Sequence, residues 1–373
     1  QRLENAGAVI FGKTNVPLML ADFQSYNEVY GTTNNPYDLT RVPGGSSGGS
    51  AAALAAGLTA LETGSDIGGS IRNPAHFCGV FGHKPTWNLL PPRGHAMGDA
   101  LTPSDISVIG PLARSAADLE IMIEVMAGPD EIQSRGMKLD LPRLDKPVSD
   151  LRVAVWRDDE MAPVDDEVKA RVDKVAAALS DLGAAVDFDA RPDFESEHTL
   201  RIFQKLLQAT MSSRVDDEQY EQMIADADAL DPNDTSPGSE TRRASVARFR
   251  SWSAMNEQRT KLRWAWHRFF QDYDVLVTPI MATAAFAHDH RPMGEREIIV
   301  NNQPQSYFAQ TFWAGLTGVV YLPSTVVPTG LNDDGLPIGV QIAGPEYADL
   351  VTIEVAKILE REGFAFTPAP AYT

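Results

Sequence analysis

The chain has one cysteine, Cys78, among its 373 residues, and no apolar run long enough to span a bilayer. A single thiol excludes an internal disulfide and, by itself, a metal site built from cysteines. The N-terminal residues also lack a basic segment followed by an apolar one, which is the pattern of a secretory signal. These absences predict a protein of the reducing cytoplasm that makes no membrane contact.

Basic residues are outnumbered, with 32 Lys and Arg against 51 Asp and Glu, so the net charge is −19. A nucleic-acid binder needs a concentrated basic face. The cluster of basic residues over 242–263 has helical character and fits a solvated helix face better. We therefore expect a small-molecule substrate as the partner and no nucleic acid. The oligomeric state is left open, with a homodimer as one option.

Histidine is scarce, with seven in the chain. His288 and His290 lie close together in the motif HDH, but no third metal ligand is nearby in the sequence. We expect a loop at this position without a metal, and no cofactor elsewhere.

The order of apolar patterns predicts an α/β fold. Residues 151–156 have the composition of a strand, residues 164–183 have apolar positions at three- and four-residue intervals, and residues 184–189 return to a strand pattern. This order indicates α/β layering. Residues 196–272 are predicted to be mostly helical.

The stretch from Gly7 to Thr14, GAVIFGKT, matches the pattern G-x-x-x-x-G-K-[ST] of phosphate-binding loops. That function needs a flexible loop after a strand, whereas residues 8–11 are all apolar and the residues before Gly7 are polar. We therefore predict a short buried strand over residues 8–11 and no phosphate loop.

The most unusual chemistry lies between Pro43 and Arg72, where the blocks GGSSGGS and DIGGSIR place serines among glycines. A flexible linker is a poor explanation because each block adjoins an apolar, ordered-looking element. Residues 45–49 also match the G-x-S-x-G nucleophile elbow. That triad needs a later Asp and then a His, and nothing singles out one of the seven histidines.

The run GGSSGGSAAALAAG, followed by GSDIGGSIRNPAHFCGVFGHKPT, resembles the signature of the amidase signature family of serine hydrolases. Four segments on either side of this run occur in the order typical of that family: GAVIFGKTNVP and NNPYDLTRVPGG before it, and DVLVTP and LTGVVYLPSTVVPTGLNDDGLPIGVQIAGP after it. The resemblance implies an α/β/α sandwich with a large mixed sheet. We expect a single domain over residues 1–373, with the helical segment 196–272 as a cap over the catalytic face.

The resemblance also implies the roles of individual residues. Ser70 would be the nucleophile that accepts the acyl group, and Ser46 would be the bridging serine, joined to Gly45 by a cis peptide bond. Backbone amides of Ile67, Gly68, Gly69 and Ser70 would form the oxyanion hole.

Other residues have supporting roles in this interpretation. Asp66 and Arg72 would brace the turn, Ser47 would orient the proton relay, and Leu20 and Ala21 would line the acyl pocket. For Asp66, Arg72 and Ser47 a structural role is as good an explanation as a direct one. We expect selectivity to reside in the cap and in residues 20–26, with an apolar pocket built from aromatic side chains: Phe23, Tyr26, Phe203, Phe308 and Trp313.

The family's triad is Ser–cisSer–Lys, and its lysine lies upstream of GAVI-type segments, so residues 1–373 are expected to lack it. Such a lysine must be buried so that its pKa falls and its amine is neutral. Lys13 and Lys84 are the nearest candidates, but the family uses both positions structurally.

Three functions follow from the resemblance. The first is an amidohydrolase that cleaves the C–N bond of a small aryl or alkyl amide through an acyl-enzyme on Ser70, with esters and carbamates as further substrates. The second is the amidase subunit of a tRNA-dependent amidotransferase. The third is a non-catalytic scaffold that lacks the lysine.

Overall fold

The fold is built around one large mixed sheet. The computed structural model describes residues 1–95 and 101–372. Eight strands follow one another across the sheet in the order β3 (Leu61–Asp66), β5 (Val108–Ala113), β4 (Phe81–Lys84), β11 (Ser324–Leu331), β12 (Pro337–Ala343), β8 (Val275–Thr278), β6 (Arg152–Val155) and β7 (Ala185–Asp187). Neighbours from β3 to β8 pair antiparallel, whereas β8, β6 and β7 run parallel. The predicted α/β fold with a large mixed sheet is confirmed.

The apolar strand sequences are explained by burial on both faces of the sheet. Strands β8 and β12 are buried at every position, so they are apolar almost throughout. Alternate residues point to opposite sides: Val275 and Val277 pack into one core and Leu276 into the other. Strand β3, at the edge, is only partly buried and correspondingly polar.

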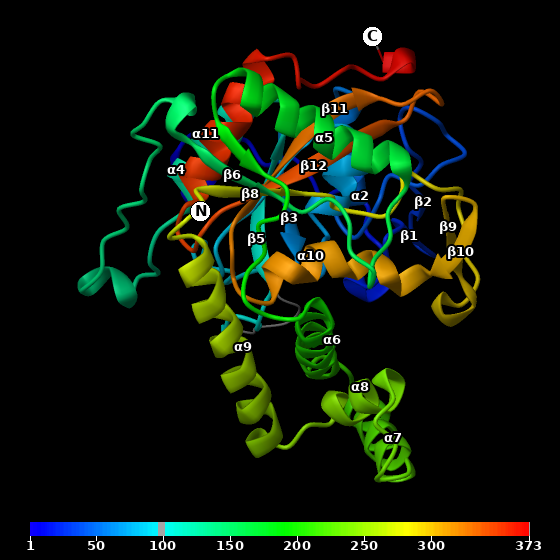
Figure 1. The fold of residues 1–373 in the computed structure, drawn as a ribbon. Coiled ribbons are helices and arrows are strands. Elements are labelled where there is room, and N and C mark those ends of the chain that lie inside the picture. The colour runs from blue at the N-terminus through cyan, green and yellow to red at the C-terminus, as the bar shows by residue number, and fades with distance from the viewer. Residues whose placement is uncertain (96–100, 373) are drawn as a thin grey trace.

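Helices cover both faces of the sheet. The core on one face includes side chains of α4 (Ala116–Met126), α5 (Asp166–Asp181) and α11 (Asp349–Arg361). The core on the other includes side chains of α2 (Gly48–Ala55), α3 (Arg72–Phe77) and α10 (Thr311–Gly318). Figure 1 shows α5 and α11 on the opposite side of the sheet from α10. The parallel pair β6 and β7 is joined through α5, because parallel neighbours need a crossover connection.

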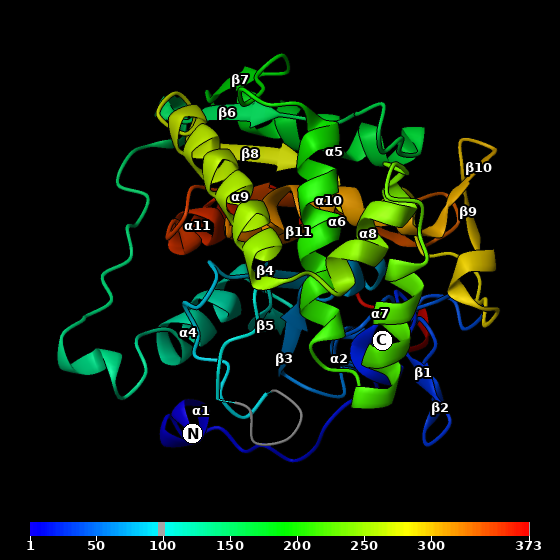
Figure 2. The ribbon, with the colours of Figure 1, turned by 90° about the horizontal axis from the view of Figure 1, so that it is seen from below.

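Four further helices form an outer layer beyond α10. They are α6 (Ser196–Ser212), α7 (Asp217–Asp228), α8 (Pro237–Ser245) and α9 (Phe249–Phe269). Figure 2 shows them in front of the sheet, with α6 nearest its centre. The side chains of Asp216 and Ser236 accept hydrogen bonds from backbone amides in the first turns of α7 and α8, which fixes where these helices begin. The predicted helical segment is therefore present. That it forms a cap over the catalytic face, and that residues 1–373 form a single domain, stay predictions.

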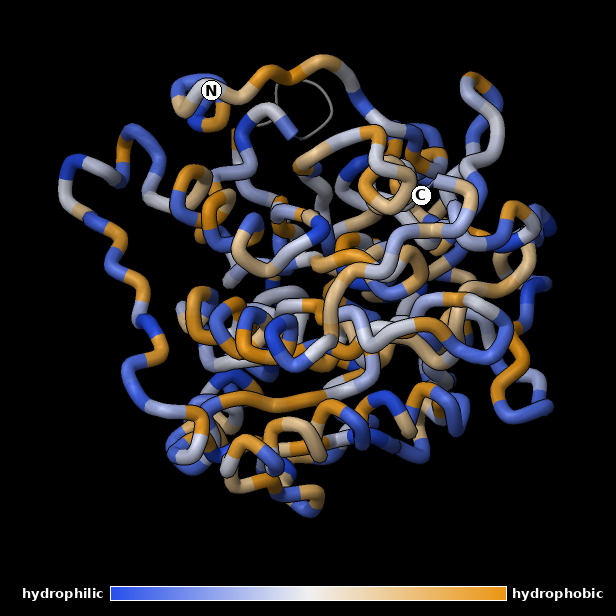
Figure 3. Tube along the Cα trace, turned by 90° about the horizontal axis from the view of Figure 1, so that it is seen from above, coloured by the Kyte–Doolittle hydropathy of each residue, from blue (hydrophilic) through white to orange (hydrophobic). Residues whose placement is uncertain are grey.

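The remaining elements are short. Within the described residues they are α1 (Arg2–Asn5), the hairpin of β1 (Tyr26–Asn27) and β2 (Gly31–Thr32), the hairpin of β9 (Glu297–Val300) and β10 (Gln303–Ser306), and six 3₁₀ turns (Leu18–Leu20, Gln133–Arg135, Val148–Asp150, Met293–Glu295, Tyr307–Gln310, Pro370–Tyr372). A long excursion between α4 and β6 stands away from the layers, and along it apolar and polar residues are mixed (Figure 3). Among the helices of the described residues, none combines the length and apolar composition needed to cross a membrane.

The expectation of a buried strand over residues 8–11 is wrong. This stretch has no strand partner, and the side chains of Val9, Ile10 and Phe11 are 85%, 62% and 79% exposed. An apolar run becomes a buried strand only where a neighbouring element covers it and accepts its backbone hydrogen bonds. Among the described residues no element does so.

Candidate active site

The two serine-glycine blocks lie against each other. The Ser47 amide donates a hydrogen bond to the Ser70 carbonyl oxygen at 3.1 Å. The Ser47 hydroxyl accepts from the Ser65 amide at 3.2 Å and donates to the Ser65 carbonyl oxygen at 3.4 Å. The turn that precedes α2 is thereby joined to the end of β3 and to the loop that leads into α3. This contact is structural, and the expected role of Ser47 in orienting the proton relay stays a prediction.

The first block forms a turn that only glycine fits. The peptide bond between Gly45 and Ser46 is cis, in agreement with the expectation. Gly44 has a φ of +88°, and a Cβ on Gly45 would lie 2.2 Å from the Asp22 carbonyl oxygen. The Gly45 amide donates to the Asn73 side-chain oxygen at 2.8 Å. Asn73, which no sequence pattern singled out, thus ties this turn to α3.

The Asp66 carboxylate organises the second block. It is 1% exposed and accepts hydrogen bonds from the amides of Gly69 (2.9 Å), Ile71 (3.1 Å) and Arg72 (3.3 Å). The Arg72 side chain adds two more, from Nε at 3.0 Å and Nη2 at 2.8 Å. Burial by itself would raise the pKa of Asp66, but the charge and hydrogen bonds of Arg72 lower it below its ordinary value. The carboxylate is therefore ionised and holds the loop around it.

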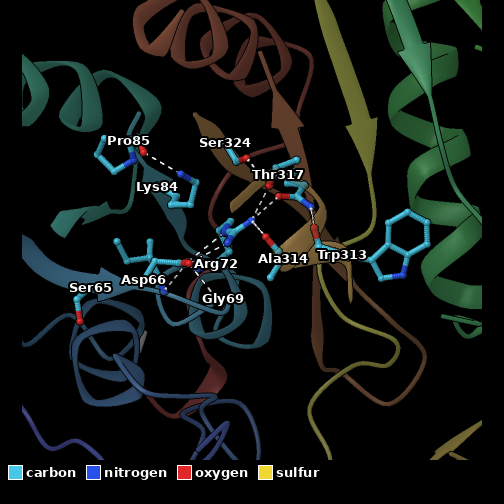
Figure 4. A network of polar contacts seen from close by, with 12 residues as sticks. Ser65, Asp66, Gly69, Arg72, Lys84, Pro85, Trp313, Ala314, Thr317 and Ser324 are labelled. Carbon is cyan, nitrogen blue, oxygen red and sulfur yellow. Dashed lines mark hydrogen bonds and ion pairs between the residues drawn. The ribbon is translucent and has the colours of Figure 1, made fainter. Parts of the chain in front are cut away.

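The Arg72 side chain connects the Asp66 loop to α10. Its side chain is fully buried, and Nη1 donates to the Ala314 carbonyl oxygen at 3.0 Å and to the Thr317 hydroxyl at 2.9 Å. A third acceptor is the Gln341 side-chain oxygen on β12 at 3.2 Å. Figure 4 shows Arg72 between Asp66 on one side and Ala314 and Thr317 on the other. The guanidinium is buried, and each of these hydrogen bonds goes to an oxygen acceptor. Arg72 is therefore held in one position between the Asp66 loop and α10.

The loop between β3 and α3 presents unpaired backbone donors. Among the described residues, the amides of Ile67, Gly68 and Ser70 have no hydrogen-bond acceptor, whereas the Gly69 amide is committed to Asp66. Unpaired amides beside a serine are the donors that could stabilise a developing oxyanion. The geometry thus leaves three of the four expected donors available.

The two serines expected to react lie on these two turns. Ser46 and Ser70 are 2% and 8% exposed. Within the part of the chain that the structure describes, no hydrogen bond joins their hydroxyls. Their contact therefore stays a prediction.

Lys84 is buried beside this framework. It is 1% exposed, and its amine donates to the Pro85 carbonyl oxygen at 2.8 Å, pointing away from Asp66 in Figure 4. Burial, and then the charge of Arg72, lower the pKa of Lys84 to about 7. Lys13 is exposed. Neither amine is bonded to Ser46.

The acyl-pocket residues expected from the resemblance lie on a strained segment. Leu20 has a φ of +58° and Met19 one of +55°, a backbone conformation that residues other than glycine rarely adopt. Leu20 and Ala21 are half-buried. This segment leads into residues 22–25, which pass behind Gly45.

An aromatic side chain from α6 covers the loop. Phe203 is fully buried, and its Cζ lies 3.8 Å from the position that a Cβ on Gly68 would take. A Cβ on Gly315 in α10 would lie only 2.4 Å from the ring, so glycine at this position admits the ring. The outer helical layer therefore reaches the serine-bearing loop.

An open groove of about 510 Å³ lies beside the β9–β10 hairpin, and its lining includes neither Ser46 nor Ser70. The candidate site is placed at the serine blocks because unpaired amides, a buried carboxylate and two serines converge there. His288 lines the groove, and no group of three metal-ligating side chains is found among the described residues.

The chain has clear relatives. Residues 1–352 match the family described as Amidase. The A subunit of the glutamyl-tRNA(Gln) amidotransferase of Koribacter versatilis (strain Ellin345) is 32% identical over 381 residues, which cover 96% of this chain and 76% of the relative. The crystal structure of the same subunit from Thermotoga maritima superimposes with a TM-score of 0.76 at 25% identity, covering 99% and 78% of the two chains. The structure of 6-aminohexanoate cyclic dimer hydrolase complexed with substrate gives a TM-score of 0.76 at 26% identity, covering 100% and 79%.

The expectation of a small-molecule partner and no nucleic acid is wrong on this finding. The relative from Koribacter versatilis is named as one subunit of an enzyme that acts on glutamyl-tRNA(Gln). The inference failed because the net charge of −19 sums over the whole chain. Such a sum says nothing about one face, or about contacts supplied by a partner protein.

Proposed function

This chain belongs to the amidase family, and we propose that it cleaves a carboxamide C–N bond through an acyl-enzyme on Ser70. The observation that carries the proposal is the loop held by Asp66. Its carboxylate binds the amides of Gly69, Ile71 and Arg72, whereas those of Ile67, Gly68 and Ser70 have no acceptor within the described part of the chain. Donors held in place before the reaction are what oxyanion stabilisation requires.

The proposed reaction has two halves. The Ser70 hydroxyl attacks the amide carbon and passes its proton toward Ser46, and the unpaired amides bind the oxyanion. The C–N bond then breaks, the leaving amine takes up a proton, and an ester to Ser70 remains. Water hydrolyses the ester and restores the hydroxyl. Lys84 is not assigned as the base because its amine is bonded to the Pro85 carbonyl oxygen.

For the substrate we propose the side-chain amide of glutamine, with the chain acting as the amide-cleaving subunit of a tRNA-dependent amidotransferase. The support is the 32% identity to one such protein over 96% of this chain. Ammonia released at Ser70 would then be used by partner subunits on an aminoacyl-tRNA.

A second candidate is the hydrolysis of a small aryl or alkyl amide, ester or carbamate without partner subunits. The observation in its favour is the apolar cover over the loop, where the buried Phe203 ring lies against Gly68. A ring at this place suits an apolar acyl group. The structural similarity to 6-aminohexanoate cyclic dimer hydrolase supports the same interpretation.

The experiment compares ammonia release from glutamine with cleavage of a panel of anilides and alkyl amides. Each is measured for the full chain, for Ser70→Ala, and for Ser65→Ala as a control on the neighbouring strand. Cleavage of either class that is lost only in Ser70→Ala supports the proposed chemistry. Glutamine turnover that rises with partner subunits and charged tRNA supports the amidotransferase, whereas anilide turnover alone supports the second candidate. Undiminished cleavage by Ser70→Ala contradicts both.

A further inference from the structure

Residues 22–25 form a support directly behind the turn that carries Ser46. A Cβ on Gly45 would lie 2.2 Å from the Asp22 carbonyl oxygen, so the two backbones are in close contact. The Ser25 hydroxyl donates to the Gly44 carbonyl oxygen at 3.0 Å and accepts from the Gly48 amide at 3.2 Å. The position of the turn therefore depends on where this segment lies.

The side chain of Asp22 fixes the segment from the opposite side. Arg296 Nη1 donates to Asp22 Oδ2 at 2.7 Å, and the Tyr307 hydroxyl donates to Asp22 Oδ1 at 2.6 Å. The side chains of Asp22 and Arg296 are 6% and 3% exposed, and Tyr307 is 2% exposed. Each carboxylate oxygen thus has its own buried donor, and the arginine also donates to the Tyr26 hydroxyl at 2.9 Å. We call Asp22, Arg296 and Tyr307 the Asp22 clamp.

A second attachment runs beside the clamp. The Gln24 side chain is fully buried, donates to the Asp289 carbonyl oxygen at 2.7 Å and accepts from the Asp289 amide at 2.9 Å. The Phe23 ring packs against the Tyr307 ring, with centroids 5.8 Å apart. Three consecutive side chains of the segment therefore bind residues more than 260 positions away in the sequence.

Strained backbone lies directly before the clamp. Met19 and Leu20, just before it, have φ of +55° and +58°. Conformations of this kind persist only where the surrounding structure imposes them. A buried carboxylate with a guanidinium and a phenol is such a constraint, because removing one partner leaves a charge without compensation in the interior.

We propose that Asp22, held by Arg296 and Tyr307, is a positioning residue for amide cleavage, because it fixes the backbone that supports the Gly45–Ser46 turn. This inference rests on the proposed function for its kinetic consequence, although the positioning itself does not depend on it. The clamp does not touch the reacting atoms. Its effect on Ser46 passes through residues 22–25.

The test uses variants of the full chain. Tyr307→Phe removes one hydroxyl and keeps the ring, and Asp22→Asn keeps the shape and removes the charge. The matched control is Tyr273→Phe, which deletes another tyrosine–aspartate hydrogen bond, to Asp187 Oδ2 at 2.5 Å on β7, at the opposite edge of the sheet from β3.

The kinetic readout is the division between kcat and KM on the substrate that wild-type turns over. We expect kcat to fall about tenfold in Tyr307→Phe and further in Asp22→Asn, with KM within about twofold, because a displaced Ser46 affects the proton relay more than substrate binding. The second readout is hydrogen–deuterium exchange of the peptide spanning residues 44–50. Exchange should become faster in both clamp variants and stay unchanged in Tyr273→Phe.

The two readouts separate failure of the inference from failure of the proposed function. Where wild-type cleaves none of the substrates tried, faster exchange over residues 44–50 in the clamp variants supports the inference by itself. Wild-type activity with no change of kcat in a folded Tyr307→Phe variant overturns it, as does exchange identical to that of the control. If wild-type cleaves none of the substrates, the proposed function is contradicted and the positioning inference is then judged from hydrogen–deuterium exchange.

Discussion

The backbone amide of Ser47 donates to the carbonyl oxygen of Ser70 at 3.1 Å, and this bond joins two blocks that are more than twenty residues apart in the sequence. Both partners are backbone atoms, so the contact depends on the paths of the two turns and not on the side chains that they carry. The same two turns hold the hydroxyls proposed to exchange a proton. The backbone paths of the two turns therefore determine where the Ser46 and Ser70 hydroxyls lie.

Ser70→Ala is expected to abolish amide cleavage, and Ser46→Ala to reduce kcat by at least about 10³-fold, since residues that act as one unit lose nearly all activity when one is removed. Mass spectrometry after reaction with a fluorophosphonate should place the adduct on Ser70. An adduct on another serine in an active protein would contradict the assignment. Ser65→Ala should behave like wild-type.

Asp66→Asn is expected to lower the free energy of unfolding by roughly 3–5 kcal/mol, because it leaves the buried Arg72 guanidinium without its counter-charge. Urea denaturation measures this change. The control is Asp173→Asn, which breaks the exposed pair with Arg157 and should cost less than about 1 kcal/mol. Equal losses of unfolding free energy for the two substitutions would contradict the prediction that the buried pair contributes more than the exposed one.

Stability is expected to rise with pH above neutrality because of Lys84. Its pKa is lowered to about 7 in the fold, while an unfolded lysine titrates near ~10.4, so between these values the unfolded chain binds the extra proton. Raising the pH through this window removes that advantage of the unfolded state. Lys84→Met should therefore show a smaller increase in urea midpoint from pH 6.5 to pH 9 than wild-type. The exposed Lys138→Met should keep the wild-type slope, and identical slopes in all three would refute the idea.

Gly315→Ala is expected to destabilise the fold by about 1–3 kcal/mol, because the new methyl group would lie 2.4 Å from the Phe203 ring. Adding Phe203→Leu should restore part of the loss, since the smaller side chain makes room. Gly318→Ala on the same helix meets its nearest atom at 3.5 Å and should be neutral or slightly stabilising. Thermal unfolding of the four variants measures the coupling, and additive effects of Gly315→Ala and Phe203→Leu would contradict it.

Much of the fold was predictable because the apolar periods are strong. Strand β6, helix α5 and strand β7 coincide with the apolar patterns of residues 151–156, 164–183 and 184–189. Residues 8–11 show where this reasoning stops: an apolar run reports a preference for burial, and only the neighbouring elements decide whether burial occurs.

The features of the candidate site also fall into two groups, those that local sequence indicated and those that only the tertiary fold brings together. The cis peptide bond at Gly45 was implied by the resemblance of a long local signature and is present in the structure, whereas the reactive roles of Ser46 and Ser70 stay predictions. Asn73 and the Asp22 clamp were not indicated, because their partners are brought near only by the fold and no spacing in the sequence marks them.

The four hydrogen-bond partners of Arg72 are synthesised at widely separated times. Asp66 emerges from the ribosome six residues earlier, whereas Thr317 and Gln341 follow 245 and 269 residues later. Until then the guanidinium has only its near partner, and the closure of so long a loop must precede the completed network. A nascent chain halted before Gln341 would lack part of the network that supports Ser46 and Ser70, and an incompletely packed chain of this kind is prone to aggregation and to binding by chaperones. The proposed amide-cleaving centre, although its serines are residues 46 and 70, therefore has its supporting network completed only after residue 341 has been synthesised.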